Sequence, residues 1–122
     1  MRHVTNVFSV LATLLLVTGC NRAESPAEVR EDVAEAQRDG TEQVADARED
    51  LARDRADTGE VFNESTAENR YELQVAKADA DRKVALEQCE TLSGSAQEAC
   101  KELAEEKYEL RKAEVERDRE RM

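Results

Sequence analysis

The segment from Cys89 to Cys100, with the sequence CETLSGSAQEAC, decides the fold of this chain. Its two cysteines lie almost symmetrically about Ser93-Gly94-Ser95. A continuous helix would hold them about 16 Å apart at 1.5 Å per residue, whereas a disulfide needs Cα atoms within about 7 Å. A Cys89–Cys100 bond therefore requires two helices that fold back at the glycine. In an oxidising compartment we expect this bond, and closing so short a loop contributes about 3 kcal/mol.

Other roles for the cysteine pair have weaker support. A metal site would need more ligands at shorter spacing, and the chain has no His after His3. A redox-active pair is more often C-x-x-C. A redox or stress-sensing role, bonding between chains and free thiols stay open as alternatives to the structural disulfide.

Helices are expected on both sides of this turn and before it. Ala, Glu, Arg, Gln and Lys, all strong helix formers, dominate the chain after residue 20. An S-x-x-E capping box begins at each of Ser25, Ser65 and Ser95, and glycines provide stop signals. These signals predict helices over three ranges: 26–57, 66–92 and 96–120.

The first predicted helix contains an eleven-residue repeat, because residues 31–39 align with residues 42–50. A weakly apolar stripe accompanies the repeat, at helical spacing that keeps it nearly straight. Its members are Val29, Val33, Ala36, Gly40, Val44, Ala47 and Leu51. The stripe indicates either a seam for helix pairing or a solvated single helix, and the sequence favours neither. Ion pairs such as Glu49–Arg53 and Asp79–Lys83 would support solvated faces.

Composition limits how much core the chain can build. The net charge is −11, and Leu, Ile, Val and Phe make up about 14% of the chain after residue 19. Such a composition is typical of disordered or non-globular chains. We therefore predict an all-α fold of long solvated helices, with a disulfide-linked C-terminal hairpin, little globular core and partial disorder as an alternative. Four leucines are the candidates to hold the hairpin together: Leu86, Leu92, Leu103 and Leu110.

Several function classes are disfavoured by the same composition. Acidic and basic residues alternate, and no basic stripe could neutralise nucleic-acid phosphates. An enzyme is not expected, since general-base histidines and glycine-rich phosphate loops are missing and a dry cleft is hard to build. No cofactor and no metal site are predicted. Acidic pairs such as Glu105-Glu106 are explained more simply as solvated helix faces.

The N-terminus has a basic start, an apolar run to Val17, and then Thr18-Gly19-Cys20. This pattern resembles the signal peptide and lipobox of bacterial lipoproteins. The resemblance implies cleavage before Cys20 and covalent acyl chains on that residue, which hold the protein on the bilayer. Asn21, where an Asp would favour inner-membrane retention, implies the outer membrane facing the periplasm.

The predicted organisation has five parts, of which the first helix is expected to be independent of the hairpin. They are residues 1–19 (signal peptide), 20–25 (acylated tether), 26–57 (charged helix), 58–65 (linker) and 66–121 (hairpin). The hairpin segment from Ala85 to Lys101 is similar to one in small, uncharacterised proteobacterial envelope proteins, a family without an assigned activity.

These features predict a membrane-anchored structural or interaction element, a helical spacer or adaptor in the periplasm. Its partners would be the lipid bilayer, through the acyl chains, and an unknown envelope protein, with self-association left open. The alternative is a stress-protective protein, because eleven-residue charged repeats loosely resemble those of desiccation-protective proteins that gain helix on drying.

Overall fold

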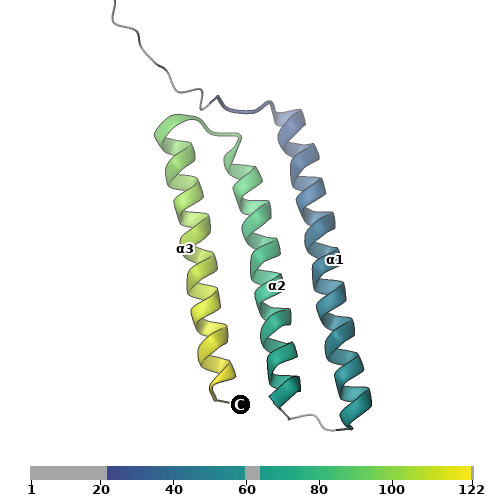
Figure 1. Cartoon of the computed structure of the whole chain (residues 1–122). Helices are drawn as coiled ribbons and strands as arrows, with labels where there is room; N and C mark the ends of the chain where they lie inside the picture. Colours follow the sequence, from purple (N-terminus) through teal and green to yellow (C-terminus); the bar gives the residue numbers. More distant parts are fainter. Residues whose placement is uncertain (1–21, 60–63, 122) are drawn as a thin grey trace, which may run out of the picture.

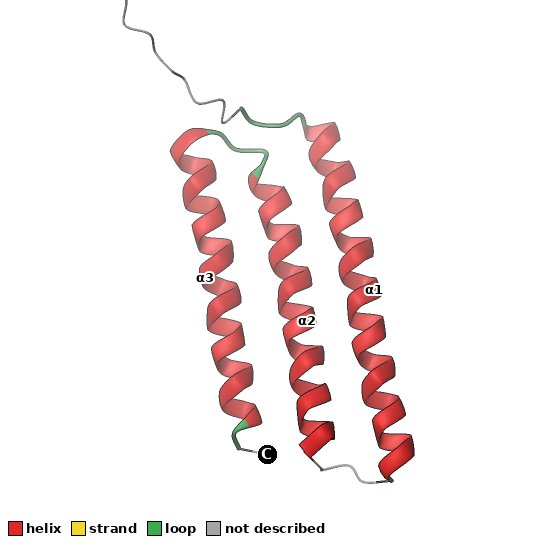
Figure 2. Cartoon of the chain, viewed as in Figure 1, coloured by secondary structure: helices red, strands yellow, loops and turns green. Residues whose placement is uncertain are grey.

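The computed structural model describes residues 22–59 and 64–121, which fold into helices α1 (Pro26–Thr58), α2 (Glu64–Cys89) and α3 (Gly94–Arg119). The helices lie side by side, with α2 in the middle and successive helices antiparallel (Figure 1). No strand occurs within the described ranges (Figure 2). The predicted all-α class with a C-terminal hairpin is thus confirmed. The predicted signal peptide and the predicted acylation site at Cys20 lie outside the described residues.

The arrangement is an open layer rather than a closed bundle. Helix α2 packs against both neighbours, whereas in the described part of the chain no Cα atom of α1 comes within 8 Å of one in α3. A closed three-helix bundle would bury one stripe of each helix at a common centre. Here α1 and α3 each bury one face against α2 and leave the opposite face as a free edge.

Helix α1 begins and ends as its sequence predicts. The Ser25 hydroxyl accepts a hydrogen bond from the amide of Glu28, and the Glu28 carboxylate accepts one from the Ser25 amide at 3.0 Å. Pro26 occupies the first turn, where its missing N–H leaves no bond unmade. Gly59 ends the helix at φ 65°, a left-handed conformation that glycine adopts without strain.

The capping boxes predicted at Ser65 and Ser95 do not form, so these two predictions are wrong. Helix α2 begins at Glu64, so Ser65 lies inside the helix and donates its hydroxyl proton to Asp54 of α1. Helix α3 begins at Gly94, and its N-cap residue Ser93 makes no side-chain capping bond. Ser95 is therefore helical too.

Helix α2 also ends three residues earlier than predicted, at Cys89 rather than residue 92. The chain leaves the helix through a tight turn in which the Leu92 amide donates to the Cys89 carbonyl at 3.0 Å. Gly94, at φ 60°, then reverses the chain and begins α3 directly.

The eleven-residue stripe of α1 is a pairing seam. All seven of its residues are buried or half-buried, and Val29, Gly40 and Leu51, spaced eleven apart, are the most buried. At Gly40 the helices approach so closely that an added Cβ would lie 2.6 Å from the Cβ of Ala80 in α2. The expectation that the first helix is independent of the hairpin is therefore wrong.

The hairpin is held by small side chains rather than by the expected leucines. Ala78 of α2 and Ala104 and Val115 of α3 are buried, with 6–7% of their surface exposed. Three of the expected core leucines are exposed instead: Leu92 at 39%, Leu103 at 51% and Leu110 at 70%. The buried positions of α3 lie on the other side of the helix from Leu103 and Leu110, so the prediction chose the wrong face.

Charged and aromatic side chains bridge α2 and α3 around this small core. Arg82 pairs with Asp79 at 2.8 Å and with Glu105 across the interface at 2.9 Å, and its guanidinium lies 5.0 Å from the Tyr108 ring centre. Half-buried pairs of this kind help to fix how α2 and α3 are oriented relative to each other, because the alanines at their interface define that orientation only weakly.

Two predicted ion pairs on the helix surfaces are confirmed, Glu49–Arg53 at 2.7 Å and Asp79–Lys83 at 3.1 Å. Within the described ranges no helix combines the length and the apolar content that crossing a bilayer requires.

Candidate functional site

The N-terminal tether lies against the turn between α2 and α3. The Glu24 amide donates a hydrogen bond to the Glu90 carbonyl at 2.8 Å. Residues 22–25 therefore cross the end of the layer from α1 towards the hairpin (Figure 1). Residues 22–25 are thus attached at two points, by the α1 cap and by the turn.

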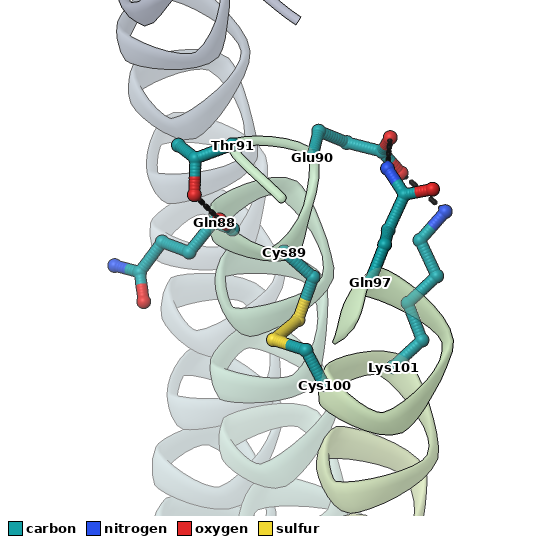
Figure 3. Close-up of a disulfide and its surroundings, with 7 residues drawn as sticks. All are labelled: Gln88, Cys89, Glu90, Thr91, Gln97, Cys100 and Lys101. Carbon is teal, nitrogen blue, oxygen red and sulfur yellow. Dashed lines mark hydrogen bonds and ion pairs between the residues drawn. A yellow bond between two sulfur atoms is a disulfide. The ribbon is translucent and has the colours of Figure 1, made fainter. Parts of the chain in front are cut away.

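Cys89 and Cys100 are bonded to each other beneath this turn (Figure 3). Their Cα atoms are 5.7 Å apart, and the Cys89 side chain is 1% exposed. The predicted disulfide and the fold-back that it requires are both present. Because Cys89 is the last residue of α2, the bond closes the hairpin at the end where the chain reverses.

A polar network that the sequence did not reveal holds the turn over the disulfide (Figure 3). Gln97 is 1% exposed, and its amide nitrogen donates to a carboxylate oxygen of Glu90 at 2.6 Å. The other oxygen of Glu90 pairs with the Lys101 ammonium group. Gln97 and Lys101 lie four apart on one face of α3, the only signal that could have indicated this network.

The tether end is strongly acidic. Partial desolvation raises the pKa of Glu24, and the neighbouring carboxylates of Asp32, Glu90, Glu87 and Glu28 raise it further. An end of this charge repels anionic surfaces. Within residues 22–59 and 64–121 no three or more metal-ligating side chains are grouped to hold an ion.

The opposite end of the layer has a different character. A groove of about 520 Å³ lies there, and buried Leu51, Leu73 and Val115 supply apolar lining from all three helices. Arginines from the three helices also line it: Arg55, Arg70 and Arg111. Asp118 also lines the groove, and Arg111 is paired with Glu114 at 2.8 Å, so the lining keeps a modest excess of positive charge in a chain of net charge −11.

Acid is expected to weaken the connection between α1 and α2. Hydrogen bonds from Ser65 and then Thr66, whose Oγ1 donates at 2.7 Å, lower the pKa of Asp54. A folded-state pKa below the unfolded-state value, which is near 3.9, stabilises the fold at pH values above that unfolded-state value. This contribution is lost as the pH falls through the folded-state pKa.

Denaturant unfolding from pH 7 to pH 2 measures the contribution of Asp54, with Asp54→Asn as the control. The free energy of unfolding of the wild type should exceed that of the variant at pH 7, and the difference between the two should shrink below about pH 4. A constant difference would contradict this prediction.

Comparisons with known proteins identify no relative of this chain. No protein-family model, no curated protein and no solved structure matches the chain.

Proposed function

We propose that this chain is a lipid-anchored structural or adaptor element of the bacterial envelope, held on the bilayer through acylated Cys20. The observation that carries the proposal is the docked tether. A sequence that resembles a lipobox ends at Cys20, and four residues later Glu24 is hydrogen-bonded to the turn beside the disulfide. The short tether would hold the disulfide end of the layer against the membrane surface.

The helices would then project from the membrane. The 26 residues of α3 correspond to about 39 Å of helix. The arginine-lined groove at the far end is the surface best placed to meet another envelope component, and its charge suits an acidic, partly apolar segment. Asn21 supports placement in the outer membrane, facing the periplasm. The proposal includes no catalysis and no cofactor beyond the acyl chains.

The stress-protective alternative has less support. A conditionally helical protein needs no defined packing, whereas Gly40 and Ala80 meet at a distance that no larger side chain would allow. The Cys89–Cys100 bond also requires α2 and α3 to fold back on each other in one particular arrangement. Circular dichroism of the acyl-free chain in dilute buffer separates the two functions. Strong helicity before drying supports the envelope element, and a coil that becomes helical on drying supports the alternative.

Acylation is tested by labelling cells with a clickable fatty acid. Wild type should be labelled and Cys20→Ser should not, because only the lipobox cysteine can carry the diacyl group. The double variant Cys89→Ala/Cys100→Ala is the matched control and should keep its label. Equal labelling of Cys20→Ser, or a mature chain that still begins at Met1, would refute the anchor. Density-gradient fractionation of the labelled protein then distinguishes outer from inner membrane.

A further inference from the structure

The outer edge of α3 exposes an apolar stripe that nothing in the layer covers. Leu103 and Leu110 are 51% and 70% exposed and lie seven residues apart. Exposed alanines continue the stripe at heptad spacing: Ala96, Ala99 and Ala113. In a chain with so few large apolar residues, two leucines left in solvent on one line mark a contact surface.

The outer edge of α1 has a complementary shape. A shallow hollow runs along it, lined by Glu31, Ala34, Gln37, Arg38, Thr41, Glu42 and Ala45. Its small residues leave room for larger side chains from a facing helix, as in knobs-into-holes packing. Hence one edge of the layer presents knobs and the other a recess.

The two edges match in height. Helices α1 and α3 begin at the same end and run in the same direction (Figure 1). Leu103 and Leu110 lie nine and sixteen residues after the start of α3, and the hollow spans positions five to nineteen after the start of α1. At a common rise per residue, both leucines fall within the length of the hollow.

Charges at equal height are also complementary. Arg38 and Glu106 each lie twelve residues into their helices, near the middle of the two edges. Neither has an ion-pair partner among the described residues. At four further pairs of positions of equal height the charges are opposite: Arg30 and Glu98, Asp39 and Lys107, Arg48 and Glu116, and Glu49 and Arg117. At two pairs they are alike: Asp46 and Glu114, and Asp50 and Asp118. Glu49 is already paired with Arg53 within α1.

We propose that a second copy of this chain docks here, parallel and side by side, with its α3 edge in the α1 hollow. The parallel orientation rests on the proposed function, because two copies anchored through Cys20 in one membrane point the same way. Since the two edges differ, the contact is heterologous and each copy keeps one free edge. Copies therefore join into open-ended rows on the membrane surface.

Pairing of α3 with α3 is a different arrangement, which would place Glu106 against its own copy in a parallel dimer. Bismaleimide crosslinking of the full chain in membranes separates the two arrangements. Ala34→Cys and Leu103→Cys supply the reactive thiols, because the bonded and acylated native cysteines do not react. Co-expressed single variants should give a crosslinked dimer, each variant alone should give none, and the double variant should give a ladder. Crosslinking of Leu103→Cys alone, or no dimer from the mixture, would overturn the proposal.

Charge reversal tests the same contact independently. In the crosslinking background, Arg38→Glu or Glu106→Arg should lower the dimer yield about fivefold, and both together should restore it. Glu72→Arg, an equal charge change at an exposed position of α2, should leave the yield unchanged. A loss caused equally by Glu72→Arg, or no recovery in the combined variant, would contradict the Arg38–Glu106 pairing.

The anchor and the edge contact fail in different ways. If Cys20 is not acylated, the protein leaves the membrane fraction. The purified chain with Cys20→Ser, in which the remaining native cysteines are bonded to each other, should still give the Ala34–Leu103 crosslink at high concentration. If Cys20 is acylated and the crosslink is absent, the edge contact alone is refuted.

Discussion

Reduction of the Cys89–Cys100 disulfide is expected to destabilise all three helices together. The cysteines are 11 residues apart, and releasing so short a loop costs about 3 kcal/mol through the greater freedom of the unfolded chain. For a domain of this size, the melting temperature should fall by more than about 10 °C. Because α1 packs along α2, we expect one transition that includes residues 26–58.

Thermal melts with and without dithiothreitol, followed by circular dichroism, measure this effect. The double variant Cys89→Ala/Cys100→Ala is the control, since it should melt near the reduced wild type and should not respond to dithiothreitol. Hydrogen exchange then reports each helix separately. An α1 that keeps its protection while α2 and α3 lose theirs would contradict a single cooperative unit, and an unchanged melting temperature would contradict the stabilising role of the bond.

Substitution of Gly40 by alanine is expected to weaken the α1–α2 seam, although alanine is the better helix former. The new Cβ would lie 2.6 Å from the Ala80 Cβ and 3.3 Å from the Ala80 Cα, so the backbone of α2 would have to move. Overpacking of this kind costs about 1–3 kcal/mol. The gain in helix propensity is about 1 kcal/mol and acts in the opposite direction. We therefore expect the free energy of unfolding, measured with denaturant, to fall by up to about 2 kcal/mol.

The facing residue supplies the matched control. Ala80→Gly removes the atom that the new methyl group meets, so the double variant Gly40→Ala/Ala80→Gly should recover most of the lost stability. Ala80→Gly alone should be destabilised by helix propensity and a small void. A strongly non-additive double-mutant cycle would show that the two positions touch. A stabilised Gly40→Ala protein would instead show that the helices are farther apart than described.

Local signals in the sequence predicted that the three helices exist better than they predicted where each helix begins and ends. The capping box at Ser25 and the stop at Gly59 depend only on nearby residues, and both are present. Ser65 has the same local pattern as Ser25, but its hydroxyl finds a distant acceptor in Asp54. No local rule contains that contact, because Asp54 reaches Ser65 only after α1 and α2 have packed.

The packing was harder to predict than the helices. Hydrophobicity favoured Leu103 and Leu110 as core residues, whereas the structure buries Ala104 and Val115. Alanine and glycine give a weak signal in any hydrophobic pattern, yet close-packed helices need small residues at their contacts. The eleven-residue stripe suggested the α1 seam, but only its partner Ala80 explains why Gly40 is there. The Cys89–Cys100 bond was predictable, because the two cysteines lie almost symmetrically about a glycine turn that allows the helices to fold back.

The bond between Glu24 and Glu90 determines how the molecule would respond to a pulling force. Tension applied at residue 22 would reach both the first turn of α1 and the far end of α2, where the disulfide passes it on to α3. Such tension acts along the helix axes and on all three helices at the same end of the layer, so no single helix is pulled away from its neighbours. The layer should therefore resist stretching from its tether more strongly than peeling from its C-terminal edge.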